Sequence, residues 1–194
     1  MGLSSKKVLV TGGAGFIGST IVEQMLTGEV GQITVVDNMI RGSEANLSAV
    51  RSDSRLEVVV GDICDQALIS RLVSDADILI HLAALRIRHC VDAPELGFDV
   101  MFRAPFDIFR CAAETGVEKV VLASSSSIYG DAEKFPTTEA HHPYNDRTLY
   151  GVGKLANEGM LRVLGDLFEL RFTALRPFNV YGPRMDIHGA YTEV

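Results

Sequence analysis

A glycine-rich stretch near the amino terminus places the strongest constraint on the fold. Residues 11–18 read TGGAGFIG, with Gly12, Gly15 and Gly18 spaced three apart. An apolar run over residues 8–10 precedes them and predicts a strand, and a segment of helical periodicity follows them. Glycines between a strand and a helix permit a tight bend, close approach of the backbone to a pyrophosphate, and close packing of helix on strand. The stretch therefore predicts a helix amino terminus presented to a dinucleotide.

The remainder of the chain alternates short apolar runs with segments of helical periodicity. Such alternation predicts parallel βαβ units, and strands that are apolar on both faces belong in a sheet covered on both sides. Right-handed crossovers then give an α/β fold with a doubly wound parallel sheet of the Rossmann type. We expect strands at residues 8–10, 33–36, 56–60, 78–82, 120–123 and 172–175, and helices at 16–26, 66–73, 94–115 and 148–167.

The composition excludes several classes of protein. A net charge of −7 at pH 7 argues against a nucleic-acid partner, because phosphate binding needs a basic face. No apolar run approaches the roughly 18 residues of a membrane span. The three cysteines, Cys64, Cys90 and Cys111, show neither zinc-site spacing nor a disulfide framework. They predict reduced thiols in a cytoplasmic protein without a metal site.

An acidic residue at the end of the second predicted strand favours NAD as the dinucleotide. Asp37 stands nineteen positions after Gly18. A carboxylate there accepts hydrogen bonds from both ribose hydroxyls and repels a 2′-phosphate, which argues against NADP. Arg41 weakens this interpretation, since arginine is the residue type that a 2′-phosphate attracts. Asp62, which follows the third predicted strand, is a candidate for contact with the adenine.

A tyrosine and a lysine on the last predicted helix supply candidate reactive side chains. Tyr150 and Lys154 are four apart and so share a helical face, and Ser125 follows the fifth predicted strand. All three are expected at the carboxyl edge of the sheet, where ligands bind in such folds. The ordinary pKa of a phenol, near ~10, is too high for a base, but a neighbouring ammonium and a nicotinamide ring would lower it. In isolation the pair is more often a surface pair, so its interpretation depends on the glycine stretch and Asp37.

With these residues in place, the chain resembles the extended short-chain dehydrogenase/reductases, in the nucleotide-sugar epimerase/dehydratase group that includes UDP-glucose 4-epimerases. The likeness extends over nearly the whole sequence, and its motifs are specific for the family but much less so for the substrate. They occupy residues 11–18, 37–38, 61–63, 81–84, 124–130, 150–154 and 176–184.

The resemblance implies a role for each matching residue. Tyr150 corresponds to the general base, Lys154 to the lysine that binds nicotinamide ribose and lowers the tyrosine pKa, and Ser125 to the residue that hydrogen-bonds the reacting oxygen. Ser124 and Ser126 compete for the last role. The other implied NAD contacts are Gly12, Gly15, Phe16, Ile17, Gly18, Asp37, Asn38, Asp62, Ile63, Leu82, Ala83, Ala84 and Pro177. The candidate substrate contacts are Asn179 and Ser126, together with Ser125, Tyr150 and Arg86, the last being alternatively a solvated charge.

Two departures from the family pattern bear on the reaction. Asp99 precedes Val100 where relatives often carry asparagine, which puts one cofactor or packing contact in doubt. Ser126 and Ser127 stand where sugar 4,6-dehydratases carry aspartate and glutamate, and a serine hydroxyl is a poor general acid. We therefore expect NAD-dependent epimerisation of a nucleotide sugar through a transient keto intermediate. A dehydratase or a reductase of the same family remains an alternative, as does a non-catalytic dinucleotide-binding module.

The expected domain organisation follows from the same motifs. Residues 1–176 are predicted to form the NAD-binding Rossmann domain, and residues 177–194 to begin a substrate-binding region that is largely absent. No clear element is predicted after residue 184, and such a sheet normally needs further chain over its carboxyl edge to enclose a ligand. The resemblance implies a homodimer formed through the helices at 94–115 and 148–167.

Overall fold

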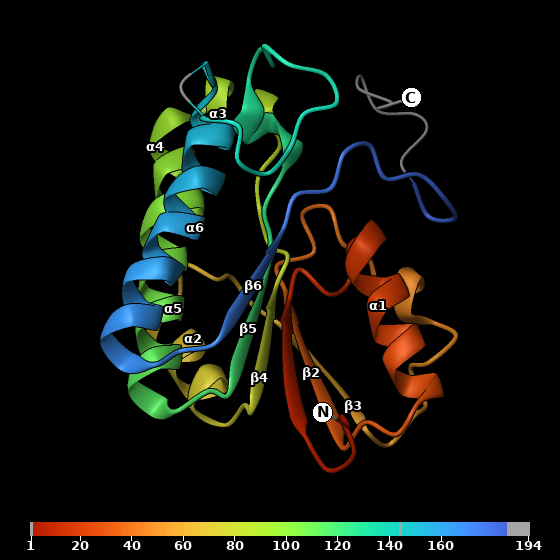
Figure 1. Cartoon of the computed structure of the whole chain (residues 1–194). Helices are drawn as coiled ribbons and strands as arrows, with labels where there is room; N and C mark the ends of the chain where they lie inside the picture. Colours follow the sequence, from red (N-terminus) through yellow and green to blue (C-terminus); the bar gives the residue numbers. More distant parts are fainter. Residues whose placement is uncertain (1, 144, 186–194) are drawn as a thin grey trace.

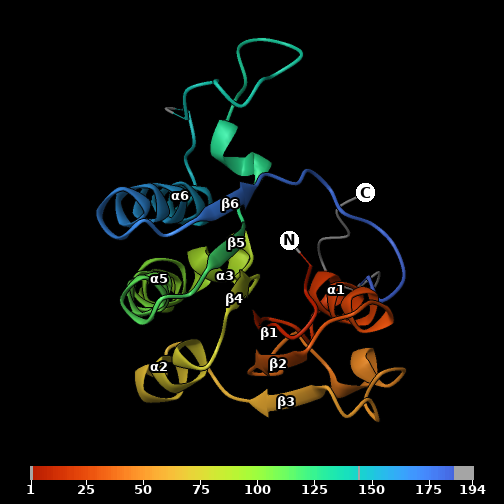
Figure 2. The same cartoon turned by 60° about the horizontal axis from the view of Figure 1, so that its bottom comes forward.

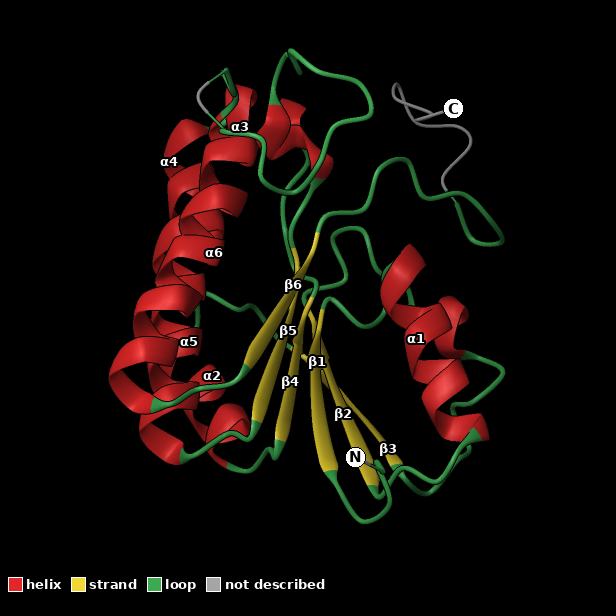
Figure 3. Cartoon of the chain, viewed as in Figure 1, coloured by secondary structure: helices red, strands yellow, loops and turns green. Residues whose placement is uncertain are grey.

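Six strands form one parallel sheet in the computed structural model, which describes residues 2–143 and 145–185 (Figures 1 and 3). The strand order is β3-β2-β1-β4-β5-β6, and every neighbouring pair is parallel. This arrangement confirms the predicted doubly wound fold. The strands are β1 (Lys7–Thr11), β2 (Gln32–Asp37), β3 (Leu56–Val60), β4 (Ile78–His81), β5 (Lys119–Ala123) and β6 (Phe172–Leu175).

Helices cover the two faces of the sheet. Figure 2 shows α1 on one face and α2, α5 and α6 side by side on the other. Apolar side chains from the sheet and these helices form one core cluster on each face. In the described part of the chain, no helix has the length and apolar character needed to cross a membrane. The helices are α1 (Phe16–Thr27), α2 (Gln66–Ser74), α3 (Ile87–Asp92), α4 (Pro94–Phe98), α5 (Ala104–Thr115) and α6 (Leu149–Phe168), with short turns η1 (Glu44–Leu47) and η3 (Ser126–Tyr129).

The order of the strands reverses between β1 and β4. The chain runs outward from β1 to β3 and then returns to place β4 on the other side of β1. At such a switch point the connections leave the carboxyl ends of adjacent strands in opposite directions, which opens a crevice for a ligand. The predicted glycine stretch follows β1, so it lies at this switch point.

The long helix predicted for residues 94–115 is interrupted by a π-helical turn. This turn, η2 (Asp99–Arg103), separates α4 from α5, and the N–H of Ala104 bonds to the carbonyl of Asp99. Pro105 has no N–H for the carbonyl of Met101, so a regular α-helix would lose a hydrogen bond there. Gly116 ends α5 in the left-handed conformation with φ 81°, as predicted.

Candidate active site

The turn between β1 and α1 has the geometry that a pyrophosphate requires. Gly12 has φ +73°, and a Cβ there would lie 2.8 Å from the backbone nitrogen of Ala83. A Cβ on Gly18 would lie 2.3 Å from the carbonyl oxygen of Gly12. Gly15 is the N-cap of α1, whose first turn has neither a side-chain cap nor an acidic residue. Phe16 and Ile17 are the first two residues of α1. The uncapped backbone N–H groups and the helix dipole at this end can bind an anionic diphosphate.

Asp37 is bonded to the glycine turn itself. Its side chain is buried, with Oδ2 accepting a hydrogen bond from the backbone nitrogen of Ala14 at 3.0 Å and Oδ1 from that of Met39 at 2.9 Å. The predicted ribose ligand therefore also fixes the shape of the phosphate-binding turn. This second role depends on the fold of the turn, so the sequence alone does not predict it. Arg41 lies exposed in the following loop.

The preference for NAD is testable at Asp37. Replacing Asp37 with alanine should weaken NAD binding by about ten- to a hundredfold, because the predicted bonds to the ribose and the observed bond to the turn are both lost. The preference for NAD over NADP should shrink, since the carboxylate no longer repels the 2′-phosphate. Titration with both dinucleotides measures the effect. If the unaltered chain binds NADP more tightly than NAD, our interpretation of Asp37 is wrong.

Two further predicted cofactor residues are brought together at the ends of β2 and β3. Asn38 donates a hydrogen bond from Nδ2 to Oδ2 of Asp62 at 2.9 Å, and the backbone nitrogen of Cys64 donates to Oδ1 at 2.8 Å. Burial would raise the pKa of Asp62, but these hydrogen bonds outweigh it and hold the pKa below its usual value. Ile63 is buried next to them. The pair lies just after the carboxyl ends of β2 and β3, where the adenine contact is predicted.

The end of β4 packs against the end of β1. The backbone nitrogens of Leu82 and Ala83 donate to the carbonyl and the hydroxyl of Thr11 at 3.0 and 3.4 Å. His81 is fully buried, and its Nδ1 lies 2.8 Å from the same hydroxyl. Burial and the charge of Lys154 lower its pKa to about 3, so the imidazole is neutral. His81 thus joins two strands, while the half-buried residues 82–84 lie beside the glycine turn.

The structure brings Tyr150 and Lys154 together as predicted. Lys154 is buried, and its Nζ donates a hydrogen bond to the carbonyl of Ala123, the last residue of β5, at 2.6 Å. The same nitrogen lies 5.8 Å from the centroid of the Tyr150 ring. Burial lowers the pKa of Lys154 to about 8. A buried ammonium next to a phenol is the arrangement that favours the phenolate.

The buried lysine should make stability depend on pH. The folded-state pKa of about 8 lies below the ordinary 10.5, so between these values the unfolded chain binds more protons and stability rises with pH. Relative to the Lys154→Met variant, the wild-type free energy of unfolding should rise by about 2–3 kcal/mol from pH 7 to pH 10. Urea unfolding of both chains without dinucleotide measures this. A difference that is constant with pH would contradict the burial of a charged lysine.

The serines after β5 divide into separate roles. The Ser124 hydroxyl donates to Oε1 of Glu158, and the Ser125 hydroxyl donates to Oγ of Ser127 at 3.0 Å. The Ser125 hydroxyl caps η3 by accepting from the backbone nitrogen of Ser127 at 3.1 Å. The backbone nitrogen of Ser126 donates to the carbonyl of Pro177 at 3.0 Å. This bond joins the loop after β5 to the predicted nicotinamide contact after β6.

The remaining predicted residues lie in the loops after β4 and β6. Arg86 is half-buried and forms the N-cap of α3, and Asn179 is exposed in the segment after β6. Asp99, which stands where relatives often carry asparagine, pairs with Arg103 at 3.0 Å on the surface.

The segment after β6 returns toward α1. Arg184 forms an ion pair with Glu23 on α1 and donates a hydrogen bond to the hydroxyl of Ser19 at 3.2 Å. Figure 1 shows this segment, in blue, passing from β6 to the end of α1 that follows the glycine turn. This contact is not predictable from the sequence, because nothing in the motif indicates which element Arg184 contacts.

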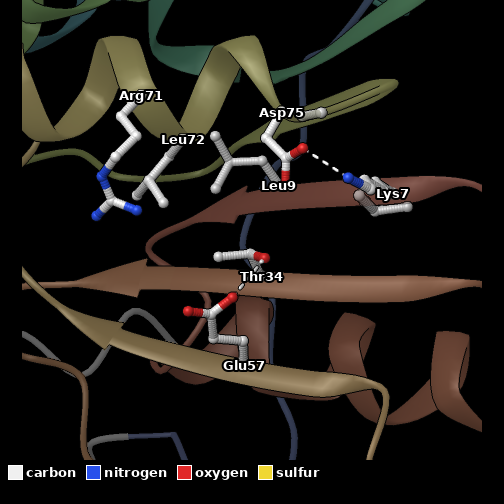
Figure 4. Close-up of a pocket in the computed structure, with 9 residues that line it drawn as sticks. Lys7, Leu9, Thr34, Glu57, Arg71, Leu72 and Asp75 are labelled. Atoms are coloured by element: carbon white, nitrogen blue, oxygen red, sulfur yellow. Dashed lines mark hydrogen bonds and ion pairs between the residues drawn. The ribbon is translucent and has the colours of Figure 1, made fainter.

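A cavity of about 170 Å³ lies elsewhere, between α2 and strands β1 to β3 (Figure 4). Lys7 and Asp75 form an ion pair at its rim, 2.5 Å apart. Lys7 begins β1, so the cavity opens near the amino ends of the strands, away from the glycine turn. None of the predicted site residues lines this cavity. Figure 4 labels seven of its lining residues: Lys7, Leu9, Thr34, Glu57, Arg71, Leu72 and Asp75.

Similarity to known proteins agrees with this geometry. A family model described as the NAD dependent epimerase/dehydratase family matches residues 8–194. The chain belongs to this family. It is 36% identical over 186 residues to the UDP-glucose 4-epimerase of Mycolicibacterium smegmatis, a match that covers 94% of the chain and 59% of that protein. The predicted membership of the extended short-chain dehydrogenase/reductases is thus confirmed.

Solved structures of two named epimerases show the same fold. UDP-N-acetylglucosamine 4-epimerase from Methanobrevibacter ruminantium, in complex with UDP-N-acetylmuramic acid, superimposes with a TM-score of 0.91 at 31% identity, over 98% of this chain and 60% of that one. UDP-glucose 4-epimerase from Thermus thermophilus in complex with NAD gives 0.84 at 34% identity, over 95% and 58%. The chain thus spans about 60% of the length of these relatives.

Proposed function

We propose that the chain binds NAD and epimerises a nucleotide sugar through a transient keto intermediate. The observation that carries the proposal is the placement of Tyr150 against the buried ammonium of Lys154, next to the end of β5. Bound NAD would supply the hydride acceptor and return the hydride to the opposite face of the sugar. The relatives named as UDP-sugar epimerases support the same reaction class.

The chain's own residues account for the proton transfer in this proposal. The Tyr150 phenolate takes the proton from the sugar hydroxyl as hydride leaves the carbon, and returns it in the reverse step. The Lys154 ammonium stabilises the phenolate by its charge. Ser125 donates a hydrogen bond to the reacting oxygen. A dehydratase also needs an acid for the leaving hydroxyl, and Ser126 and Ser127 are too weakly acidic for that role.

The assembly and location proposed for the chain rest on exposed apolar side chains and on free cysteines. Large apolar side chains are exposed on the outer helices, among them Phe98 at 48%, Val163 at 56% and Leu167 at 69%. A second copy of the chain would bury them, so we propose a homodimer through α4, α5 and α6. The three free cysteines, Cys64, Cys90 and Cys111, support the proposed cytoplasmic location.

The proposed domain organisation places the boundary after β6. Residues 1–176 would form the NAD-binding domain, and the segment from 177 would begin the substrate-binding region. Its first part, to residue 185, contacts α1 through Arg184. Residues 186–194 lie outside the described residues.

Product analysis distinguishes the proposed function from its alternatives. Incubation with UDP-glucose or UDP-galactose, each with NAD, should yield the other epimer without net formation of NADH. Anion-exchange chromatography separates the nucleotide sugars, and absorbance at the NADH band follows the cofactor. Accumulation of NADH would favour a dehydrogenase, and a 4-keto-6-deoxy sugar would favour a dehydratase. Binding of NAD without any product would favour the non-catalytic module.

A further inference from the structure

A buried ion pair joins three elements beneath the proposed site. Glu158 on α6 is only 4% exposed. Its Oε1 accepts hydrogen bonds from the hydroxyl of Ser124 at 2.5 Å and from Nε of Arg176 at 2.9 Å. Its Oε2 accepts from Nη2 of Arg176 at 2.7 Å. We call Glu158, Arg176 and Ser124 the carboxylate cluster.

The arginine of the carboxylate cluster extends it to the loop after β5. Nη1 of Arg176 donates to the hydroxyl of Tyr129 at 3.3 Å and to the carbonyl of Glu139 at 3.0 Å. Its guanidinium carbon lies 5.2 Å from the centroid of the Tyr129 ring. Tyr129 in turn stacks on Phe178 with a centroid distance of 6.3 Å. One guanidinium therefore holds β6, α6 and the loop between η3 and α6 together.

The ion pair of Glu158 and Arg176 fixes the positions of its partners more than it stabilises the fold. Burial opposes the charge on Glu158, but the hydrogen bonds from Arg176 and Ser124 outweigh it and lower the pKa of the carboxyl. The partner carboxylate raises the pKa of Arg176. A buried ion pair contributes little net stability over an apolar replacement, because desolvation offsets the attraction. Its planar, bidentate geometry fixes the relative positions of its partners closely.

Each member of the carboxylate cluster adjoins a residue of the proposed site. Glu158 lies one helical turn after Lys154 on α6. Ser124 directly precedes Ser125, and Arg176 directly precedes Pro177. Pro177 is itself bonded through its carbonyl to the loop after β5. A change in the carboxylate cluster is thus passed to the lysine, the serine and the proline through one peptide bond or one helical turn.

We propose that the carboxylate cluster is the positioning device of the reactive edge. It sets the distance of α6 from the carboxyl ends of β5 and β6. Tyr150 and Lys154 are thereby held at fixed positions relative to Ser125. Glu158, Arg176 and Ser124 are positioning residues, since each acts through a neighbour. The inference rests on the proposed function, because these relative positions matter only if a proton and a hydride are transferred there.

The Glu158→Gln variant tests the positioning role. It keeps the shape of the side chain but replaces the charge, so the bidentate pair with Arg176 is lost. Turnover with UDP-glucose should fall by about 30- to 100-fold, because small displacements of reacting groups are costly. The KM for UDP-glucose and the dissociation constant of NAD should stay within about threefold of the wild-type values, since the glycine turn follows β1 and Asp37 ends β2. In the pH–rate profile, the limb that reports ionisation of Tyr150 should move about one pH unit to higher pH. The cause is that Lys154 moves away from the phenol and stabilises the phenolate less.

The chain offers a matched control at the opposite end of the sheet. Arg55 contacts Asp53 through Nε at 3.0 Å and Nη2 at 2.7 Å, the same bidentate geometry, just before β3 begins. Asp53→Asn breaks that pair and should lower the melting temperature while leaving turnover within twofold. Ser124→Ala removes one hydrogen bond and keeps the ion pair. It should lower turnover by about three- to tenfold, and it serves as the test if Glu158→Gln does not fold.

The outcomes separate this inference from the proposed function. An inactive wild-type chain overturns the proposed function and the positioning role with it. The positioning role alone is overturned if the wild type is active and both Glu158→Gln and Ser124→Ala turn over as fast as Asp53→Asn. The same follows if turnover falls but the pH–rate profile does not move, since that result indicates a purely structural role.

Discussion

Replacing Tyr150 with phenylalanine is expected to lower turnover by about three orders of magnitude or more and to leave NAD affinity within about threefold of wild type. The substitution removes only the hydroxyl that transfers the proton, a contribution of ~10²–10⁴ in general acid–base catalysis. The ring and its contact with Lys154 remain. Steady-state epimerisation and NAD titration measure the two effects separately.

A second tyrosine provides the control for that experiment. Tyr181 is 81% exposed in the segment after β6, so Tyr181→Phe removes a hydroxyl of the same kind from a solvated side chain. Its turnover should stay within about twofold of wild type. Turnover by Tyr150→Phe within tenfold of wild type would rule out Tyr150 as the general base.

Adding one methyl group at Gly18 should nearly abolish dinucleotide binding. The new Cβ would lie 2.3 Å from the carbonyl oxygen of Gly12 and 2.7 Å from the Cα of Gly13, so backbone must move. The turn that faces the pyrophosphate would open. We expect NAD affinity to fall at least about a hundredfold and the free energy of unfolding to fall by about 1–3 kcal/mol. Calorimetric titration and urea unfolding measure these changes.

Gly159 on α6 is the matched control for the Gly18 substitution. A Cβ there has no atom within 4 Å among its described surroundings, and the residue lies inside a helix. Gly159→Ala should therefore stabilise the chain by about 0.5–1 kcal/mol and leave NAD binding unchanged. Equal loss of NAD affinity in both variants would show that the position in the turn is not what matters.

The fold was predictable because its signals are local. Apolar runs such as residues 33–36 and 56–60 mark strands whose observed bounds differ from the predicted ones by no more than a residue. The glycine stretch ties the first strand to the first helix, and parallel topology follows from alternation. The helix α3, at residues 87–92, was not predicted because six residues give too little periodicity.

The candidate site was predictable only in part. Tyr150 and Lys154 share a helical face, so their proximity follows from spacing alone. Ser124 and Ser125 are neighbours after the same strand, and their different hydrogen-bond partners, Glu158 and Ser127, follow only from the fold. The partnership of Glu158 with Arg176 joins residues eighteen apart across a helix and a strand, a contact that no local pattern specifies.

The π-helical turn between α4 and α5 makes the number of residues in that segment matter as much as their identity. It inserts one residue relative to a regular helix, and thereby rotates everything before Asp99 by about 100° about the axis. In the observed rotation Gly97 faces Leu149, where a Cβ would lie 3.0 Å from Leu149 Cδ2, directly before Tyr150. Deleting a single residue from Asp99–Arg103 would straighten the helix and turn α4 away from the first turn of α6. We therefore expect a one-residue deletion to disturb the position of Tyr150 more when it falls in Asp99–Arg103 than when it falls in a surface loop.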